Sequence, residues 1–151
     1  MTKKTDIFVA IDTQSQENAK KLIGQLNNKH CGIKIGKELF TSCGPEIVQW
    51  VKSEGFEVFL DLKFHDIPNT VMKACEAASK MNVDIINVHS LGGKEMMSAA
   101  KNAVSNQQIK LIGVTLLTSH DKNFMIEVGL SGSIDDCVKK LAINAAESGL
   151  D

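Results

Sequence analysis

The sequence of 151 residues contains no arginine, so its 17 lysine and arginine positions are all lysines. A site for a phosphate or a carboxylate therefore lacks, within these residues, the planar guanidinium that commonly binds such groups through two parallel hydrogen bonds. Any phosphate bound by these residues would depend on lysine side chains and backbone N–H groups.

Cysteine motifs and long apolar runs are also missing. The four cysteines include no C-x-x-C pair, which argues against a zinc site and against a dithiol redox motif. The N-terminal apolar run over residues 7–11 stops at Asp12, so it is too short for a signal peptide or a membrane span. We therefore expect a cytoplasmic protein with no membrane attachment.

The rest of the composition is that of a globular protein. With 43% hydrophobic and 23% charged residues, we expect residues 1–151 to form a single domain with a buried core. The formal net charge of −1 argues against nucleic acid or an anionic membrane as a partner. A small-molecule ligand is more consistent with this nearly neutral net charge.

Short apolar runs alternate with amphipathic segments, and the runs begin roughly every 25 residues, as in βα units. The predicted strands cover residues 7–11, 33–36, 59–63, 84–88 and 111–117. Five buried parallel strands fit either a doubly wound open sheet or part of a (βα)8 barrel. A complete barrel takes about 250 residues, so a TIM-type barrel would be incomplete here, with about five α/β units from its N-terminal part.

The last predicted helix follows Ser133 and Asp136, which stand at the spacing of a capping box. Gly149 is its predicted end. Its expected inner face consists of Ile134, Val138, Leu141, Ala142 and Ala145.

The third predicted strand, over residues 59–63, is mostly apolar and expected to be buried, yet it carries two charged residues. Side chains alternate along a strand, so Asp61 and Lys63 are expected on one face and the neighbouring leucines on the other. Burying a carboxylate and an ammonium costs free energy unless they pair. Such a pair favours a functional site over ordinary core.

Polar residues follow the other predicted strands as well, at the end that forms the catalytic face of a barrel. They are Asp12, Lys34, Asp61, Lys63, Asp66, His89 and Thr118. Taken singly, Asp12, His89 or Thr118 is equally compatible with an ordinary polar loop. The group around Lys63 favours function, because two acids lie within three residues of one lysine on a buried strand.

Two neighbouring carboxylates would keep Lys63 protonated and fixed in place. A fixed ammonium group is suited to deliver a proton to carbon, while a nearby carboxylate repels a substrate carboxylate and favours its departure as CO2. No cofactor is needed if the substrate itself delocalises the developing charge.

The run over residues 60–70, LDLKFHDIPNT, resembles the signature of the orotidine 5'-phosphate decarboxylase family. Residues 10–12, 34–36, 87–89 and 117–119 are similar to that family in order and spacing. A bare D-x-K-x-x-D is shared with other barrel decarboxylases and synthases, whereas the continuation over residues 67–70 is specific to the orotidylate branch.

The resemblance implies decarboxylation of orotidine 5'-phosphate to UMP and CO2, the last step of de novo pyrimidine synthesis, without metal or organic cofactor. Lys63 would protonate the carbon left by CO2, and Asp61 would lie against the departing carboxylate. Lys34 and Asp12 would hold the ribose side, and Thr118 would contact the pyrimidine edge.

In that family the residues matching Asp66 and Thr70 belong to the partner subunit's site, which implies a homodimer with shared active sites. Ile67, in the same segment, is included among the expected substrate-binding positions.

Two other interpretations remain open at this point. A sister barrel enzyme acting as a sugar-phosphate decarboxylase or synthase could use Asp61 and Asp66 to hold a divalent metal. Alternatively, a non-catalytic half-barrel could serve as a binding module, its exposed edge strands covered by a partner.

In barrels of this kind the phosphate commonly binds at the loops after the seventh and eighth strands, where the family carries an arginine and a glutamine. We therefore expect residues 1–151 to be a fragment, or the ordered part of a longer product, and to be inactive alone. An assay of CO2 release from orotidine 5'-phosphate by the purified 151 residues checks this, and measurable turnover contradicts it.

Overall fold

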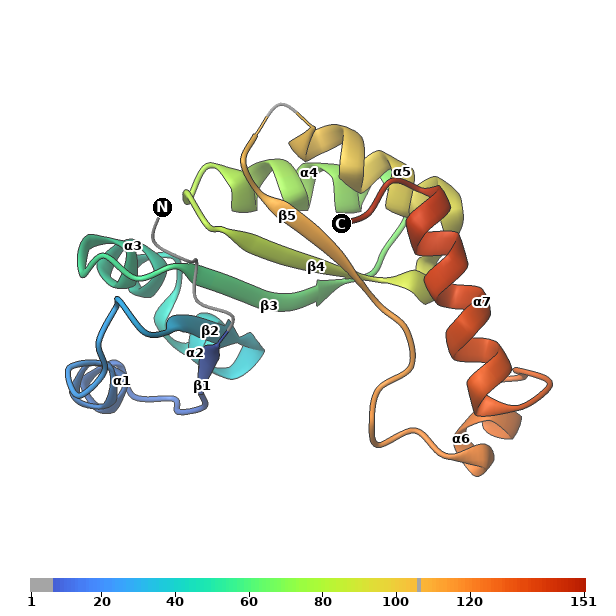
Figure 1. The fold of residues 1–151 in the computed structure, drawn as a ribbon, viewed down its shortest axis with the longest axis horizontal. Coiled ribbons are helices and arrows are strands. Elements are labelled where there is room, and N and C mark those ends of the chain that lie inside the picture. Colours follow the sequence, from blue (N-terminus) through green and yellow to red (C-terminus); the bar gives the residue numbers. More distant parts are fainter. Residues whose placement is uncertain (1–6, 106) are drawn as a thin grey trace.

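The computed structural model describes residues 7–105 and 107–151, which form one sheet of parallel strands with helices packed against it (Figure 1). The strands are β1 (Phe8–Ile11), β2 (Gly32–Gly36), β3 (Val58–Phe64), β4 (Ile85–His89) and β5 (Lys110–Val114). Their order in the sheet is their order in the chain. The prediction of successive parallel α/β units is confirmed, and in the described residues the sheet is open, with β1 and β5 as its edges.

Helices connect the strands and follow the last one. They are α1 (Gln16–Ile23), α2 (Lys37–Cys43), α3 (Glu46–Ser53), α4 (Pro68–Ser79), α5 (Gly93–Val104), α6 (Lys122–Glu127) and α7 (Ile134–Glu147), with a 3-10 turn η1 (Ser90–Gly92) before α5. Helices α4 and α5 lie side by side (Figure 1) and make the most extensive helix contact in the described part of the chain. No helix there has the length and hydropathy to cross a lipid bilayer.

The core lies between the sheet and these helices. Ile33 and Ile35 of β2 and Leu60 of β3 are fully buried, as are Val48 and Val51 of α3. The two α3 valines stand three residues apart, so they share the helix face that packs inward. The polar carboxyl ends of the strands are thus held on a rigid apolar support.

Strand β5 ends at Val114, so the prediction of a strand as far as residue 117 is wrong. The last pair of its ladder joins Val114 to His89, the final residue of β4. Beyond His89 the chain turns into η1, so β5 loses its hydrogen-bonding partner there. Thr118 consequently lies in a loop and is exposed.

The predicted cap and end of α7 are confirmed, and its predicted inner face is correct except for Ala142. Ser133 accepts a hydrogen bond from the backbone N of Asp136 at 3.1 Å, and Gly149 has the left-handed φ of +80° that ends the helix. Of the five expected inner residues Leu141 and Ala145 are buried, Ile134 and Val138 are half-buried, and Ala142 is exposed. Helix α7 packs mainly on α5 and η1 and extends beyond the sheet (Figure 1), so its inner face is only partly covered.

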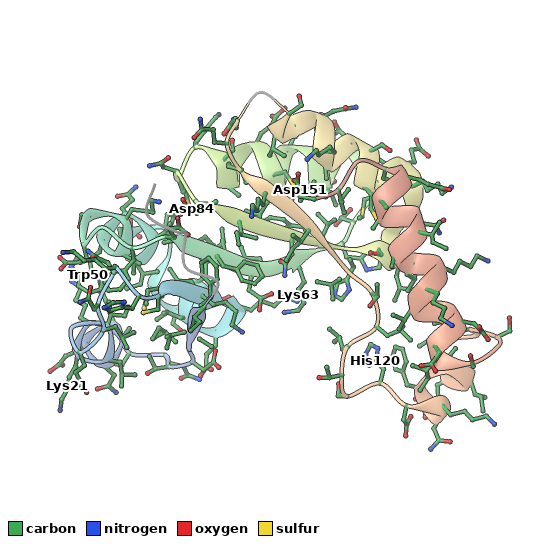
Figure 2. The ribbon with its side chains drawn as sticks, viewed as in Figure 1. Lys21, Trp50, Lys63, Asp84, His120 and Asp151 are labelled. Carbon is green, nitrogen blue, oxygen red and sulfur yellow. The ribbon has the colours of Figure 1, made fainter. Side chains whose placement is uncertain are left out.

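A carboxylate braces the amino end of β3. Asp84 Oδ2 accepts hydrogen bonds from Lys52 Nζ and from the backbone N of Val58, each at 2.7 Å. Asp84 therefore joins α3, β3 and the start of β4 at one point. Figure 2 shows it at the opposite end of β3 from Lys63.

Candidate active site

Strand β3 changes its pairing with β4 just where the charged residues begin. Leu60 pairs with Ile86 and Phe64 with Val88, so β3 runs four steps where β4 runs two. Within this bulge Lys63 has a φ of +51°, in the left-handed region that non-glycine residues seldom adopt. The prediction of simple strand alternation through Lys63 is therefore wrong, although its side chain still meets that of Asp61.

The bulge surrounds Asp61 with hydrogen-bond donors from two strands besides its own. Its Oδ1 accepts from Lys63 Nζ at 2.5 Å and from Asn87 Nδ2 at 2.6 Å, and its Oδ2 accepts from Lys34 Nζ at 3.3 Å. Lys34 comes from β2 and Asn87 from β4. Asp61 itself is only 7% exposed, so these donors replace most of its water.

The charge state of Asp61 follows from these contacts. Burial by itself would raise the pKa of the carboxyl, but hydrogen bonds from Lys63, Asn87 and Lys34 and the charge of Lys63 outweigh it, so the pKa lies below its usual value of 3.8. The site therefore holds a buried carboxylate between two lysines at neutral pH.

A cavity of about 620 Å³ opens over this cluster. Its lining contains five of the predicted site residues, namely Asp12, Lys34, Asp61, Lys63 and Thr118. The other lining residues are Gly36, Lys37, Val114, Leu116, Leu117 and Ser119. Side chains that follow or end four of the five strands thus meet in one place, as their strand positions predicted.

Asp66, Ile67 and Thr70 do not line this cavity. All three are exposed on the segment that joins β3 to α4 and on the first turn of α4. The carboxylate of Asp66 accepts a hydrogen bond from the backbone N of Ile67 at 2.7 Å. Within the described chain these residues therefore take no part in the lining of the cavity.

Several residues of the site were not singled out from the sequence. Lys37 is the first residue of α2, directly after β2, and it lines the cavity. Its position after a strand end, like that of the other lysines, was the signal in the sequence that could have identified it. Asn87 interrupts the apolar run of β4 and is 2% exposed. A polar side chain in the middle of a covered strand was the signal that identifies it.

His89, the last residue of β4, lies beside the cluster but does not line the cavity. Its ring centroid is 5.6 Å from that of His65, and burial, followed by the charges of His65, Lys37 and Lys63, lowers its pKa. It is therefore uncharged at neutral pH. In the part of the chain that the structure describes, no three His, Cys, Asp or Glu residues group as metal ligands would.

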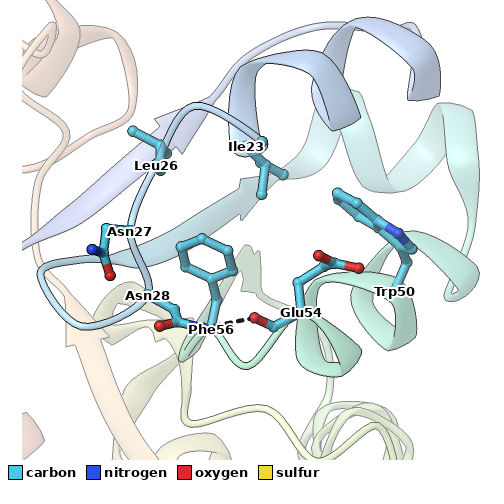
Figure 3. A pocket seen from close by; sticks show the side chains of 8 residues that line it. Ile23, Leu26, Asn27, Asn28, Trp50, Glu54 and Phe56 are labelled. Atoms are coloured by element: carbon cyan, nitrogen blue, oxygen red, sulfur yellow. Dashed lines mark hydrogen bonds between the residues drawn. The ribbon is translucent and has the colours of Figure 1, made fainter.

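A second cavity of about 290 Å³ lies between the end of α1 and the end of α3 (Figure 3). Its wall is formed by Ile23, Leu26, Trp50 and Phe56, and Asn28 Nδ2 closes one side by donating to the backbone O of Glu54 at 2.8 Å. Glu54 is the one ionisable residue in its lining. The lysines and carboxylates singled out from the sequence line the first cavity instead.

Comparison with known proteins assigns the chain to a family. The model of the "Orotidine 5'-phosphate decarboxylase / HUMPS family" matches residues 5–151. The chain belongs to this family. The five parallel strands of the structure agree with the fold that the resemblance to this family implied.

Relatives named orotidine 5'-phosphate decarboxylase cover nearly all of this chain. That of Nitrosospira multiformis is 48% identical over 145 residues, which are 96% of this chain and 61% of the relative. That of Idiomarina loihiensis is 50% identical over 146 residues, which are 95% of this chain and 63% of the relative. The chain thus spans a little over three fifths of their length.

The fold is also shared with solved structures. A crystal structure of orotidine 5'-phosphate decarboxylase from Lactobacillus acidophilus superposes with a TM-score of 0.90 at 32% identity, covering 96% of this chain and 68% of that one. A Geobacillus kaustophilus protein of 37% identity also gives a TM-score of 0.90, over 96% of this chain and 71% of its own. Both likenesses support the assignment to an incomplete TIM-type barrel.

The lowered pKa of Asp61 predicts how the cluster responds to acid. Because the folded value lies below the unfolded one, the stability contributed by ionised Asp61 is present above the unfolded pKa and is lost as pH falls through the folded pKa. Carbon-detected NMR of the Asp61 carboxyl should give a midpoint below 3.8, and Lys63→Met should move it upward. A wild-type midpoint at or above 3.8 contradicts the geometry.

Proposed function

We propose that the protein decarboxylates orotidine 5'-phosphate to UMP and CO2. The observation that carries this proposal is the buried Asp61 carboxylate held between Lys63 and Lys34 at the base of a cavity of about 620 Å³. Cavities of roughly 300–1,000 Å³ hold small ligands, so a nucleotide is of a suitable size. Relatives of this chain named for the same reaction support the choice of substrate.

The reaction uses charge that is already in place. The substrate carboxylate lies against ionised Asp61, and their repulsion is relieved when the carbon–carbon bond breaks and neutral CO2 leaves. The bonding electron pair remains on the pyrimidine carbon, and Lys63 donates a proton from Nζ to that carbon. The neutral lysine then takes a proton from solvent, which restores the starting state.

Asp61 keeps the proton donor in position, and Lys34 helps to keep Asp61 ionised. At about 4 Å and an effective dielectric constant near 20, an opposite-charge contact contributes on the order of 4 kcal/mol before desolvation is subtracted. Asp61 makes such contacts with both lysines. The ammonium of Lys63 is therefore held at the carboxylate instead of exploring solvent.

The remaining lining residues orient the nucleotide. Asp12 and Lys34 hold the ribose side, and Thr118, on the loop after β5, contacts the pyrimidine edge. These roles need no metal or organic cofactor, because the pyrimidine ring delocalises the developing charge. We place the protein in the cytoplasm, and the four free cysteines fit such a reducing compartment.

The active unit is proposed to be a homodimer with shared sites. Asp66 and Thr70 lie outside the cavity of their own chain and are exposed, so they are free to complete the site of a second copy. Ile67 between them is 65% exposed, a large apolar side chain that a partner surface would cover.

Removal of the proton donor tests the mechanism. In the full gene product, Lys63→Ala should lower kcat by at least about 100-fold, the scale of general acid catalysis. UMP binding measured by calorimetry should persist, because the rest of the lining is unchanged. Lys139→Ala, an exposed lysine of α7, is the matched control and should keep wild-type activity. Near-normal turnover by Lys63→Ala would remove Lys63 from this role.

Subunit mixing tests the shared site. Lys63→Ala and Asp66→Ala should each be inactive alone, but a mixed dimer has one site with native Lys63 and native Asp66. Random re-pairing after co-refolding should restore about one quarter of wild-type activity. Mixing Lys63→Ala with Lys34→Ala is the control, since both changes fall in a chain's own cavity and restore nothing. No recovery in the first mixture contradicts the shared site.

A further inference from the structure

The side chain of Asn87 joins the two charged residues of β3 from the neighbouring strand. Its Oδ1 accepts from the backbone N of Lys63 at 2.7 Å, and its Nδ2 donates to Asp61 Oδ1 at 2.6 Å. The residue is 2% exposed in the middle of β4 and does not line the cavity. Asn87 therefore acts on the site only through its hydrogen bonds to Asp61 and Lys63.

The bulge in β3 makes this contact necessary. Between Leu60 and Phe64 the regular register with β4 is interrupted, and the N–H of Lys63 is bonded by an amide side chain in place of a strand carbonyl. An unpaired buried donor is costly. Lys63 also holds a left-handed φ of +51°, a conformation that persists only where surrounding contacts fix it.

The orientation of the amide follows from the chemistry of its partners. A backbone N–H can only donate, so the amide oxygen must face Lys63 and the NH2 group must face Asp61. An NH2 group needs an acceptor, which the ionised Asp61 Oδ1 supplies. That same oxygen contacts Lys63 Nζ, so one amide is bonded to the carboxylate of the ion pair and to the backbone that carries its lysine.

We propose that Asn87 is a positioning residue that sets the backbone of Lys63 and the carboxylate of Asp61 in register before substrate arrives. Its consequence for turnover rests on the proposed decarboxylation, whereas its effect on the two groups it contacts does not. A residue that merely fills space in β4 would influence neither group specifically.

The chain offers a matched control at the other end of the same strand. Asp84 also accepts from a β3 backbone N, that of Val58, at 2.7 Å, and also contacts a lysine, Lys52. Asp84→Ala removes comparable bonds from β3 at the end remote from the cavity (Figure 2). It reports how the site responds to a general weakening of the sheet.

The first test uses structural readouts on the full gene product. Asn87→Ala should speed hydrogen exchange of the Lys63 amide by at least about tenfold and raise the pKa of the Asp61 carboxyl measured by NMR. Asn87→Asp is the second variant and keeps the size of the side chain. It should retain protection of the Lys63 amide but raise the Asp61 pKa, because it sets a second carboxylate beside the first. Asp84→Ala should change neither quantity.

The second test is kinetic. Asn87→Ala should lower kcat for orotidine 5'-phosphate by about tenfold or more while KM changes by less than about threefold, because the residue acts on the donor and not on the ligand. Asp84→Ala should stay within about twofold of wild type in both.

The inference is overturned if Lys63 exchange and the Asp61 pKa are unchanged in both Asn87 variants, if the loss falls on KM alone, or if Asp84→Ala lowers kcat equally. Absence of decarboxylation in the wild-type protein would instead overturn the proposed function. The exchange and pKa measurements would still decide the role of Asn87.

Discussion

The site depends on the hydrogen bonds that stabilise the buried carboxylate of Asp61. A buried negative charge is stable only when enough donors replace its water, and here one amide and two lysines do so. Those donors come from β2, β3 and β4, so the charge links three neighbouring strands at their carboxyl ends. The apolar layer beneath them then fixes how far the strands can move apart, and with it the geometry of the charges.

The local backbone is adapted to this charge and departs from ideal strand geometry. A regular β3 would carry Lys63 in an extended conformation, whereas the observed φ of +51° turns the chain at that residue. The bulge lets both Asp61 and the Lys63 ammonium reach one point while the N–H of Lys63 stays bonded. Strain of this kind, on the order of 1–3 kcal/mol, is found at functional sites because surrounding contacts hold it.

Much of the fold was predictable because it depends on short-range pattern. The apolar runs located all five strands to within a few residues, and Ser133 with Asp136 located the start of α7. The end of β5 at Val114 was not predictable, because it is set by where β4 turns away and not by residues 115–117. The exposed face of α7 likewise depends on what packs against it.

The site, like the fold, has one part that was predictable from the sequence and one part that was not. Parallel strands present their carboxyl ends at one edge of a sheet, so the predicted strand ends were enough to group the residues that line the cavity. These are Asp12, Lys34, Asp61, Lys63 and Thr118. The bulge at Lys63 and the orienting role of Asn87 need knowledge of register between two strands, which a single sequence does not contain.

Because the sheet keeps chain order, the strands that form the site emerge in that same order during synthesis. Lys34 and Asp61 are 27 residues apart, and Lys63 and Asn87 are 24 apart, so each contact closes a short loop at a modest entropic cost. The lysine–carboxylate pairs need only β2 and β3, whereas the amide that orients them is supplied by β4. A nascent chain ending before residue 87 would therefore contain all the charges of the cluster without the contact that fixes their arrangement.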